Sequence, residues 1–119
     1  SESLAMELSV RTDERTHRVD VSGEMDMYNS TELKSLYLRL REEDHKPCIF
    51  DLGNLSYIDS SGISALIYIF TQSKATGVPV CYVNVHGSVR RVVELTSLLG
   101  FLPIAESDAE AMKKIFGSH

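Results

Sequence analysis

The sequence has no apolar run near the roughly 20 residues that a membrane-spanning helix needs, and its first residues lack the charged-then-apolar pattern of a signal peptide. Positive charge is also scarce, since 12 Lys and Arg stand against 17 Asp and Glu, for a formal net charge of −5. This balance argues against nucleic acid or an anionic membrane as a partner and favours a protein or a small molecule. We therefore expect a cytoplasmic protein.

Motifs for cofactors and metals are missing as well. The two cysteines, Cys48 and Cys81, lie in apolar stretches and match no metal or redox spacing, so we expect both to be small core residues. No phosphate-binding glycine loop occurs, and His, Cys, Asp and Glu do not fall at metal-ligand spacings. The sequence therefore predicts no cofactor and no metal site.

A small serine hydrolase that uses Ser60 or Ser61 is a remote alternative. Ile58 breaks the Gly-x-Ser-x-Gly pattern of a nucleophile elbow. None of the histidines lies in a stretch that reads as a pocket wall, and each is expected in a solvated loop or at a strand edge: His17, His45, His86 and His119. A general base is therefore missing.

The length of 119 residues predicts one domain, residues 1–119, with a core of about residues 4–116. Alternating apolar residues predict a β-hairpin over residues 6–21, followed by a loop at 23–26. A helix is expected next, capped by Asn29 or Ser30, with Glu32 placed for a capping box.

Strands and helices are then expected to alternate. Strands are predicted at residues 48–52, 78–85 and 102–105, and helices from the 59–62 corner to about 75, from a cap at Ser88 to near Gly100, and after a Ser107–Glu110 capping box. This order predicts an α/β domain with a central mixed β-sheet and helices mainly on one face.

The most informative stretch is Asp59-Ser60-Ser61-Gly62, which lies between a buried strand and an amphipathic helix. Asp and Ser are frequent N-cap residues, so capping alone would explain them. A helix entrance is also a favourable place for negative charge, because its first amides lack partners and the helix dipole is positive there. A phosphoserine would be structurally tolerated at this corner.

Two further pairs of charged residues could form a functional site. Asp26 and Asp59 would form a carboxylate pair if their loops lay at the same end of the sheet, although loop aspartates more often serve turns and caps. Arg90-Arg91 could bind an anion, but a solvated helical face is the favoured reading.

Three stretches resemble the STAS domain of bacterial anti-sigma factor antagonists: residues 22–26, 50–63 and 89–101. The most specific is the run Asp-Leu-x-x-Leu-x-x-Ile-Asp-Ser-Ser-Gly at 51–62, and the resemblance spans about residues 4–116. It implies a mixed sheet with helices mainly on one side, in agreement with the independent reading of the elements.

The resemblance also implies a function, a phosphorylation-gated partner switch that is not itself an enzyme. The unphosphorylated antagonist would bind an anti-sigma factor that is also a serine protein kinase, and so free its client sigma factor. A PP2C-type serine phosphatase would reverse the modification.

Carried over by position, the phosphoacceptor would be Ser60, with Ser61 as second choice and as a neighbouring cap. Asp26 and Asp59 would belong to the partner-docking face together with both serines, and Gly62 would give the backbone room at the corner.

The identity of the client stays open. Besides a sigma factor, a STAS subunit could serve a stressosome-like assembly, a secretion or biofilm switch, or a transporter. The absence of a membrane segment argues mildly against obligate attachment to a transporter.

Overall fold

The computed structural model describes residues 5–117, so Leu4 and His119 lie outside the described residues. The strands are β1 (Glu7–Thr12), β2 (His17–Met25), β3 (Cys48–Ile58), β4 (Val80–Val83) and β5 (Ile104–Ala105). The helices are α1 (Ser30–Glu43), α2 (Ser60–Thr76), α3 (Gly87–Leu95) and α4 (Asp108–Phe116). Over residues 5–117, none of these helices has the length and apolar character needed to cross a membrane.

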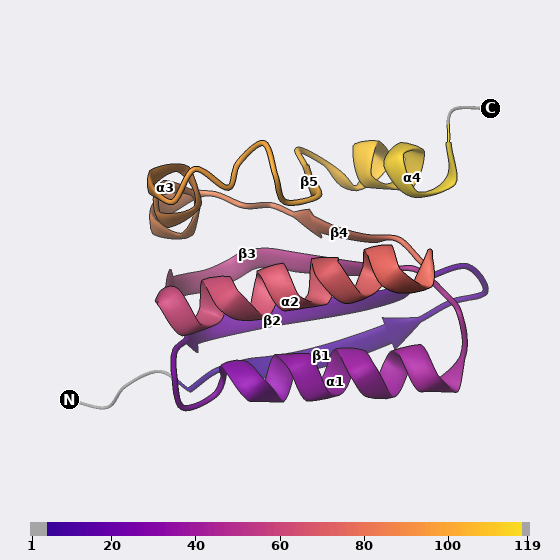
Figure 1. Cartoon of the computed structure of the whole chain (residues 1–119), viewed down its shortest axis with the longest axis horizontal. Helices are drawn as coiled ribbons and strands as arrows, with labels where there is room; N and C mark the ends of the chain where they lie inside the picture. Colours follow the sequence, from indigo (N-terminus) through magenta and orange to yellow (C-terminus); the bar gives the residue numbers. More distant parts are fainter. Residues whose placement is uncertain (1–4, 118–119) are drawn as a thin grey trace.

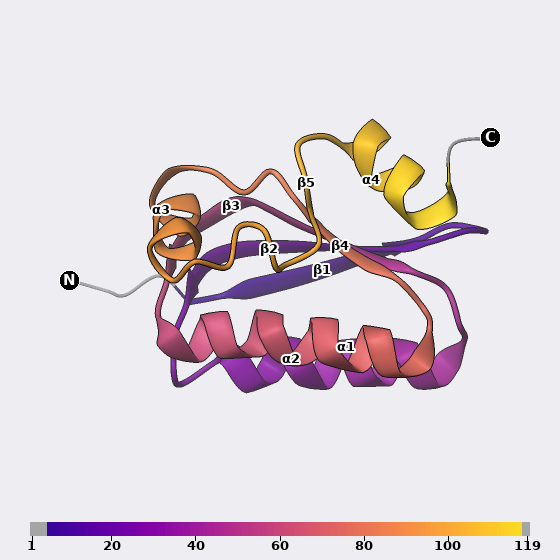
Figure 2. The ribbon, with the colours of Figure 1, turned by 45° about the horizontal axis from the view of Figure 1, so that its top comes forward.

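The strands form one mixed sheet in the order β1-β2-β3-β4-β5. β1 and β2 are the predicted antiparallel hairpin, and every later neighbour pairs in parallel. Figure 1 shows α1 and α2 side by side along the sheet. In the turned view of Figure 2 they cover one face, while α4 lies on the other. The predicted α/β architecture is confirmed, with α4 as the helix on the second face.

Alternation along β3 explains the two layers. Phe50 and Leu52 are buried in the large core beneath α1 and α2. Ile49 points to the opposite face and belongs to a smaller cluster with Ala111 of α4. Since successive strand residues face opposite sides, the unbroken apolar start of β3, residues 48–50, requires cover on both faces.

β2 and β3 are longer than the sequence predicted. The expected loop at residues 23–26 is strand up to Met25, and the expected strand at 48–52 continues to Ile58. Gly23, with φ +91°, lies at an irregularity in the β2–β3 register rather than in a loop. The pairing survives because Leu55 and Ile58 on β3 are buried.

The predicted bounds and cap of the third helix are also wrong. α3 ends at Leu95, short of Gly100, and Ser88 lies within it. The Ser88 hydroxyl donates to the Ser56 carbonyl at 2.7 Å, which fastens α3 to the end of β3 instead of capping the helix. The predicted Ser107 cap of α4 is confirmed, because the Ser107 hydroxyl oxygen accepts from the Glu110 amide at 3.1 Å. The predicted capping box is only half formed, since the Glu110 carboxylate lies 3.4 Å from Lys114 Nζ instead.

The cysteines lie where the sequence placed them. Cys48 and Cys81 are free and buried in neighbouring strands. Burial raises the pKa of the Cys48 thiol to about 12, so at neutral pH it is protonated and unreactive.

His17 was expected in a solvated loop or at a strand edge, and this prediction is wrong, because it is buried at the start of β2, which lies between β1 and β3. Its side chain is only 2% exposed. Its Nδ1 lies 2.8 Å from the Thr12 hydroxyl, and its Nε2 lies 2.8 Å from Asp44 Oδ1, just after α1. Buried polar groups need partners, and these two contacts join the hairpin to the end of α1. His45 and His86 are exposed, as expected.

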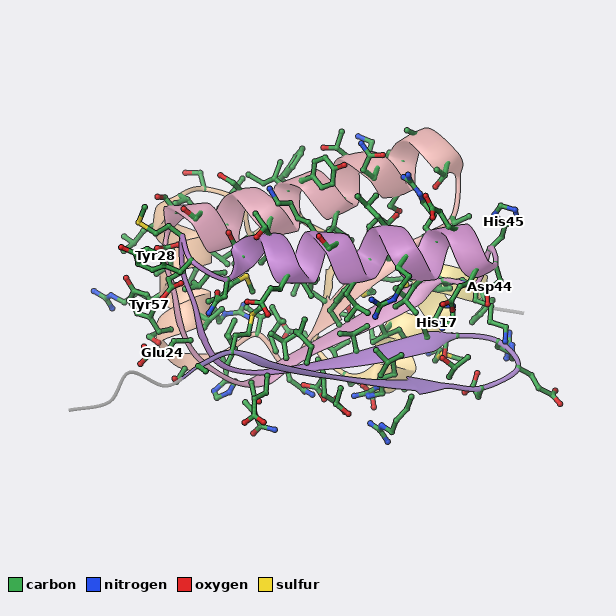
Figure 3. All side chains as sticks on the ribbon, turned by 90° about the horizontal axis from the view of Figure 1, so that it is seen from below. His17, Glu24, Tyr28, Asp44, His45 and Tyr57 are labelled. Atoms are coloured by element: carbon green, nitrogen blue, oxygen red, sulfur yellow. The ribbon has the colours of Figure 1, made fainter. Side chains whose placement is uncertain are left out.

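We predict that His17→Ala lowers the free energy of unfolding by about 2–4 kcal/mol, because it removes both contacts and leaves a cavity. Urea denaturation followed by circular dichroism measures the change. His45→Ala is the matched control: Figure 3 shows His45 at the same end of the molecule, and its side chain is exposed. Equal midpoints for the two variants would show that His17 has no structural role.

Candidate functional site

The loops that follow β2 and β3 lie side by side at one end of the sheet (Figure 1). The strands are parallel neighbours, and Met25 pairs with Ile58 as the last residue of each. The Asp59 amide donates to the Met25 carbonyl at 3.2 Å. Asp26 and Asp59, the first residues after these strands, therefore belong to one surface, which meets the condition set by the sequence.

Asp59 is the N-cap of α2. Its Oδ1 accepts from the Gly62 amide at 3.0 Å, and its backbone carbonyl accepts from the Ile63 amide at 3.0 Å. Its Oδ2 accepts from the Met27 amide at 3.2 Å, across the gap between the loops. One carboxylate thus starts the helix and holds the neighbouring loop. The cap is Asp59 and not Ser61, which is already the second residue of α2.

Asp26 organises the first loop. Its Oδ1 accepts from the Tyr28 amide at 2.9 Å, and its amide donates to Asn29 Oδ1 at 2.9 Å. Asn29 also donates through Nδ2 to the Glu24 carbonyl at 2.9 Å. These bonds occupy the Asn29 side chain, so the predicted capping box with Glu32 is not formed. The loop is instead closed by its own side chains.

The two serines differ in accessibility. Ser60, the first residue of α2, is exposed, whereas Ser61 is half-buried. Gly62 is buried beneath them, and a Cβ on it would stand 2.5 Å from Ile58 Cγ1 and 3.2 Å from Met25 Sδ. The helix therefore approaches the ends of both strands closely, with the Ser60 hydroxyl on the outside.

Charge around Ser60 has two components. The first turn of the 17-residue α2 contains no acidic side chain, so the positive end of its dipole is opposed only by the Asp59 cap. Asp59 nevertheless places one carboxylate next to Ser60, and Asp26 places a second in the neighbouring loop. The site can accept an added anion within the fold, but presents it on an already acidic surface.

The positions of the three histidines within residues 5–117 do not favour hydrolysis at these serines. Figure 3 shows His17 and His45 at the end of the molecule away from the loops. His86 has its Nε2 2.8 Å from the Gly53 carbonyl.

The alternative of an anion site at Arg90-Arg91 is weakened at Arg90. Its guanidinium lies 3.9 Å from the Glu94 carboxylate and 3.5 Å from the Glu106 carboxylate, so its charge is compensated.

Over residues 5–117, His, Cys, Asp and Glu form no group of three or more that could hold a metal ion.

Sequence reasoning missed three apolar side chains beside the loops. Met27 is 64% exposed, Tyr28 85% and Tyr57 47%. The signal available was a pair of apolar residues, Met27-Tyr28, directly after the polar turn that ends a strand.

Comparison with known proteins agrees with this fold. The family model for the STAS domain matches residues 7–111. The anti-sigma-B factor antagonist of Staphylococcus aureus is 23% identical over 103 residues, which cover 87% of this chain and 95% of that protein.

Two solved proteins have similar structures. An anti-sigma factor antagonist from Mycobacterium paratuberculosis superimposes with a TM-score of 0.80 at 19% identity, covering 94% of this chain and 95% of the other. The anti-sigma factor antagonist SpoIIAA in its unphosphorylated form gives 0.74 at 20% identity, with coverage of 97% and 99%. SpoIIAA of Bacillus in its phosphorylated form gives 0.66 at 19%, with coverage of 93% and 99%.

We predict that Gly62→Ala destabilises the protein by about 2 kcal/mol, since the 2.5 Å contact with Ile58 places the overpacking cost near the upper end of about 1–3 kcal/mol and alanine recovers about 1 kcal/mol of helix propensity. The urea midpoint measures this. Gly100→Ala serves as control because no heavy atom beyond its two chain neighbours lies within 4 Å of its added Cβ. A Gly62→Ala protein as stable as wild type would contradict the close contact.

Proposed function

Because the chain belongs to the STAS domain family, we propose that it is an anti-sigma factor antagonist switched by phosphorylation of Ser60. The unmodified protein binds an anti-sigma factor that is also a serine protein kinase, and this binding frees the client sigma factor. A PP2C-type phosphatase restores the unmodified form. The protein is a binding partner and a kinase substrate, and is not itself an enzyme.

One observation carries the proposal: Ser60 is exposed at the first position of α2, directly after the Asp59 cap and beside the Asp26 loop. Ser61 is half-buried and is the weaker candidate. The names of the relatives, and the structures of SpoIIAA in its phosphorylated and unphosphorylated forms, support an anti-sigma factor antagonist that is regulated by phosphorylation.

The transfer itself needs little from this chain. The Ser60 oxygen attacks the γ-phosphorus of ATP, the bond from that phosphorus to the β,γ-bridging oxygen breaks to release ADP, and the hydroxyl proton passes to a base of the kinase. The chain supplies an accessible hydroxyl on a rigid helix end. Asp26, Asp59, Ser61 and Gly62 complete the docking face around it.

Electrostatics explain how the modification changes binding. A phosphate adds about −1.5 to −2 charges at neutral pH. Ser60 follows the Asp59 carboxylate in a chain whose formal net charge is −5. Before modification, the partner surface contacts an uncharged Ser60 hydroxyl. After modification it would have to desolvate a phosphate dianion at the same place, so the affinity falls without refolding of either protein.

We predict that Ser60→Ala abolishes phosphate incorporation from ATP by the cognate kinase, while Ser61→Ala retains it. Mass spectrometry of the products locates the phosphate. Ser60→Ala is also expected to bind the anti-sigma factor and to stay bound when ATP is added. Unchanged incorporation in Ser60→Ala would rule out Ser60 as the acceptor.

We further predict that phosphorylation acts locally. Amide NMR shifts of the phosphorylated protein should change around residues 25–30 and 58–64, because the Asp59 contacts link these two segments. Residues of β1 and α4 should keep their shifts. Changes that spread through the whole sheet would contradict a local switch.

A further inference from the structure

Three of the seven large, exposed apolar side chains among the described residues lie near Ser60: Met27, Tyr28 and Tyr57. Tyr28 is 85% exposed, and Met27, just before it in the same loop, is 64% exposed. Tyr57, 47% exposed, stands next to Glu24 in the β2–β3 register. Figure 3 shows Tyr28, Tyr57 and Glu24 together at this end of the molecule.

We propose that Met27, Tyr28 and Tyr57 form the apolar anchor through which the protein binds its anti-sigma factor. This inference rests on the proposed function and adds the residues that supply affinity. The matching partner surface has apolar pockets for the two aromatic rings, and lysine or arginine side chains at their rim.

The loop holds its anchor residues in place before any partner arrives. The Tyr28 amide donates to Asp26 Oδ1 at 2.9 Å, and the Met27 amide donates to Asp59 Oδ2 at 3.2 Å. Both backbone amides are thus fixed by carboxylates, while both side chains face solvent. Such preorganisation lowers the entropy cost of association, and tyrosine is among the residues that most often dominate binding energy.

Tyr57 is exposed because of its strand position. Leu55 and Ile58 carry the burial of this part of β3, at 3% exposure each, so Tyr57 gains little from the core. It precedes Ser60 by three residues, and the Met27 amide is bonded to the residue just before Ser60. The anchor therefore borders the hydroxyl from both loops.

The charge of the rim selects the partner. Glu24 pairs with Tyr57, Asp26 precedes Met27, and the Asp59 carboxylate accepts from the Met27 amide, so an apolar partner surface with basic residues at its edge is complementary. A phosphate on Ser60 would stand at the border of the anchor, and its bound water would have to be removed when the partner binds there. Affinity and its loss on phosphorylation would thus come from one patch.

Leu95, 74% exposed, is the last residue of α3 and belongs to neither loop. Phe101 and Tyr68 also lack the features of the anchor. Phe101 is covered in part by Phe70, whose ring centre lies 5.3 Å away in an edge-to-face arrangement. Tyr68 is 36% exposed in α2, eight residues beyond Ser60, and Lys34 Nζ lies 5.5 Å from its ring centre. Tyr68 is therefore a matched control for removal of an exposed tyrosine outside the anchor.

The test uses isothermal titration calorimetry with the purified anti-sigma factor of the source organism. Tyr28→Ala and Tyr57→Ala should each weaken binding at least about tenfold, in the range of anchor residues. Tyr28→Phe should keep most of the affinity, because the ring is retained. Tyr68→Ala should stay within about twofold of wild type, as expected away from the contact. Urea midpoints near wild type confirm that the variants are folded.

The outcomes separate the two proposals. If wild type binds and the Tyr28→Ala and Tyr57→Ala proteins bind equally well, the anchor is wrong and the proposed function stands. If the wild-type protein binds none of the organism's purified anti-sigma factors, the proposed function fails, and the anchor fails with it. A loss as large in Tyr68→Ala as in Tyr28→Ala would also overturn the anchor.

Discussion

The Asp59 carboxylate joins the two segments on which the site depends. One oxygen accepts from the Gly62 amide and starts α2, and the other accepts from the Met27 amide in the loop after β2. Parallel pairing of β2 with β3 brings these loops together, with Met25 opposite Ile58. Because Gly62 has no side chain, the helix can approach both strand ends closely. Without the Asp59 contacts, the β2–β3 pairing or the glycine at position 62, the position of Ser60 would no longer be fixed relative to the Met27–Tyr28 loop.

Most of the fold could be predicted because its signals are local. The hairpin, the end of α2 before Gly77 and the Ser107 cap of α4 all follow from residues within a few positions of each other. The lengths of β2 and β3 could not be predicted in this way. Glycines at 23 and 53 suggest a break, but the strands continue through register shifts because each is paired with the other. Pairing between strands is not a local property.

In the site, too, local features could be predicted and features that depend on distant partners could not. A cap was predictable at the 59–62 corner, but which side chain caps depends on competing partners. The Asn29 side chain is taken by its own loop and the Ser88 hydroxyl by the Ser56 carbonyl, whereas Asp59 is free to cap. Burial of His17 likewise depends on Asp44, 27 residues away. The exposure of Tyr28 and Tyr57 follows from where the loops meet, and residue type alone does not predict it, because tyrosine is intermediate between buried and exposed residue types.

A phosphate on Ser60 would act very differently on folding and on binding. At a helix N-terminus an anion gains about 0.3–1 kcal/mol from the dipole, and the first turn of α2 has no acidic side chain to oppose it. Repulsion from the neighbouring Asp59 carboxylate offsets part of this gain, so the net effect on stability is small in water, where exposed charges are screened. At a protein interface the same charges lose that screening, and like-charge contact costs several kcal/mol. The position of Ser60 therefore allows a large change in affinity with little change in stability.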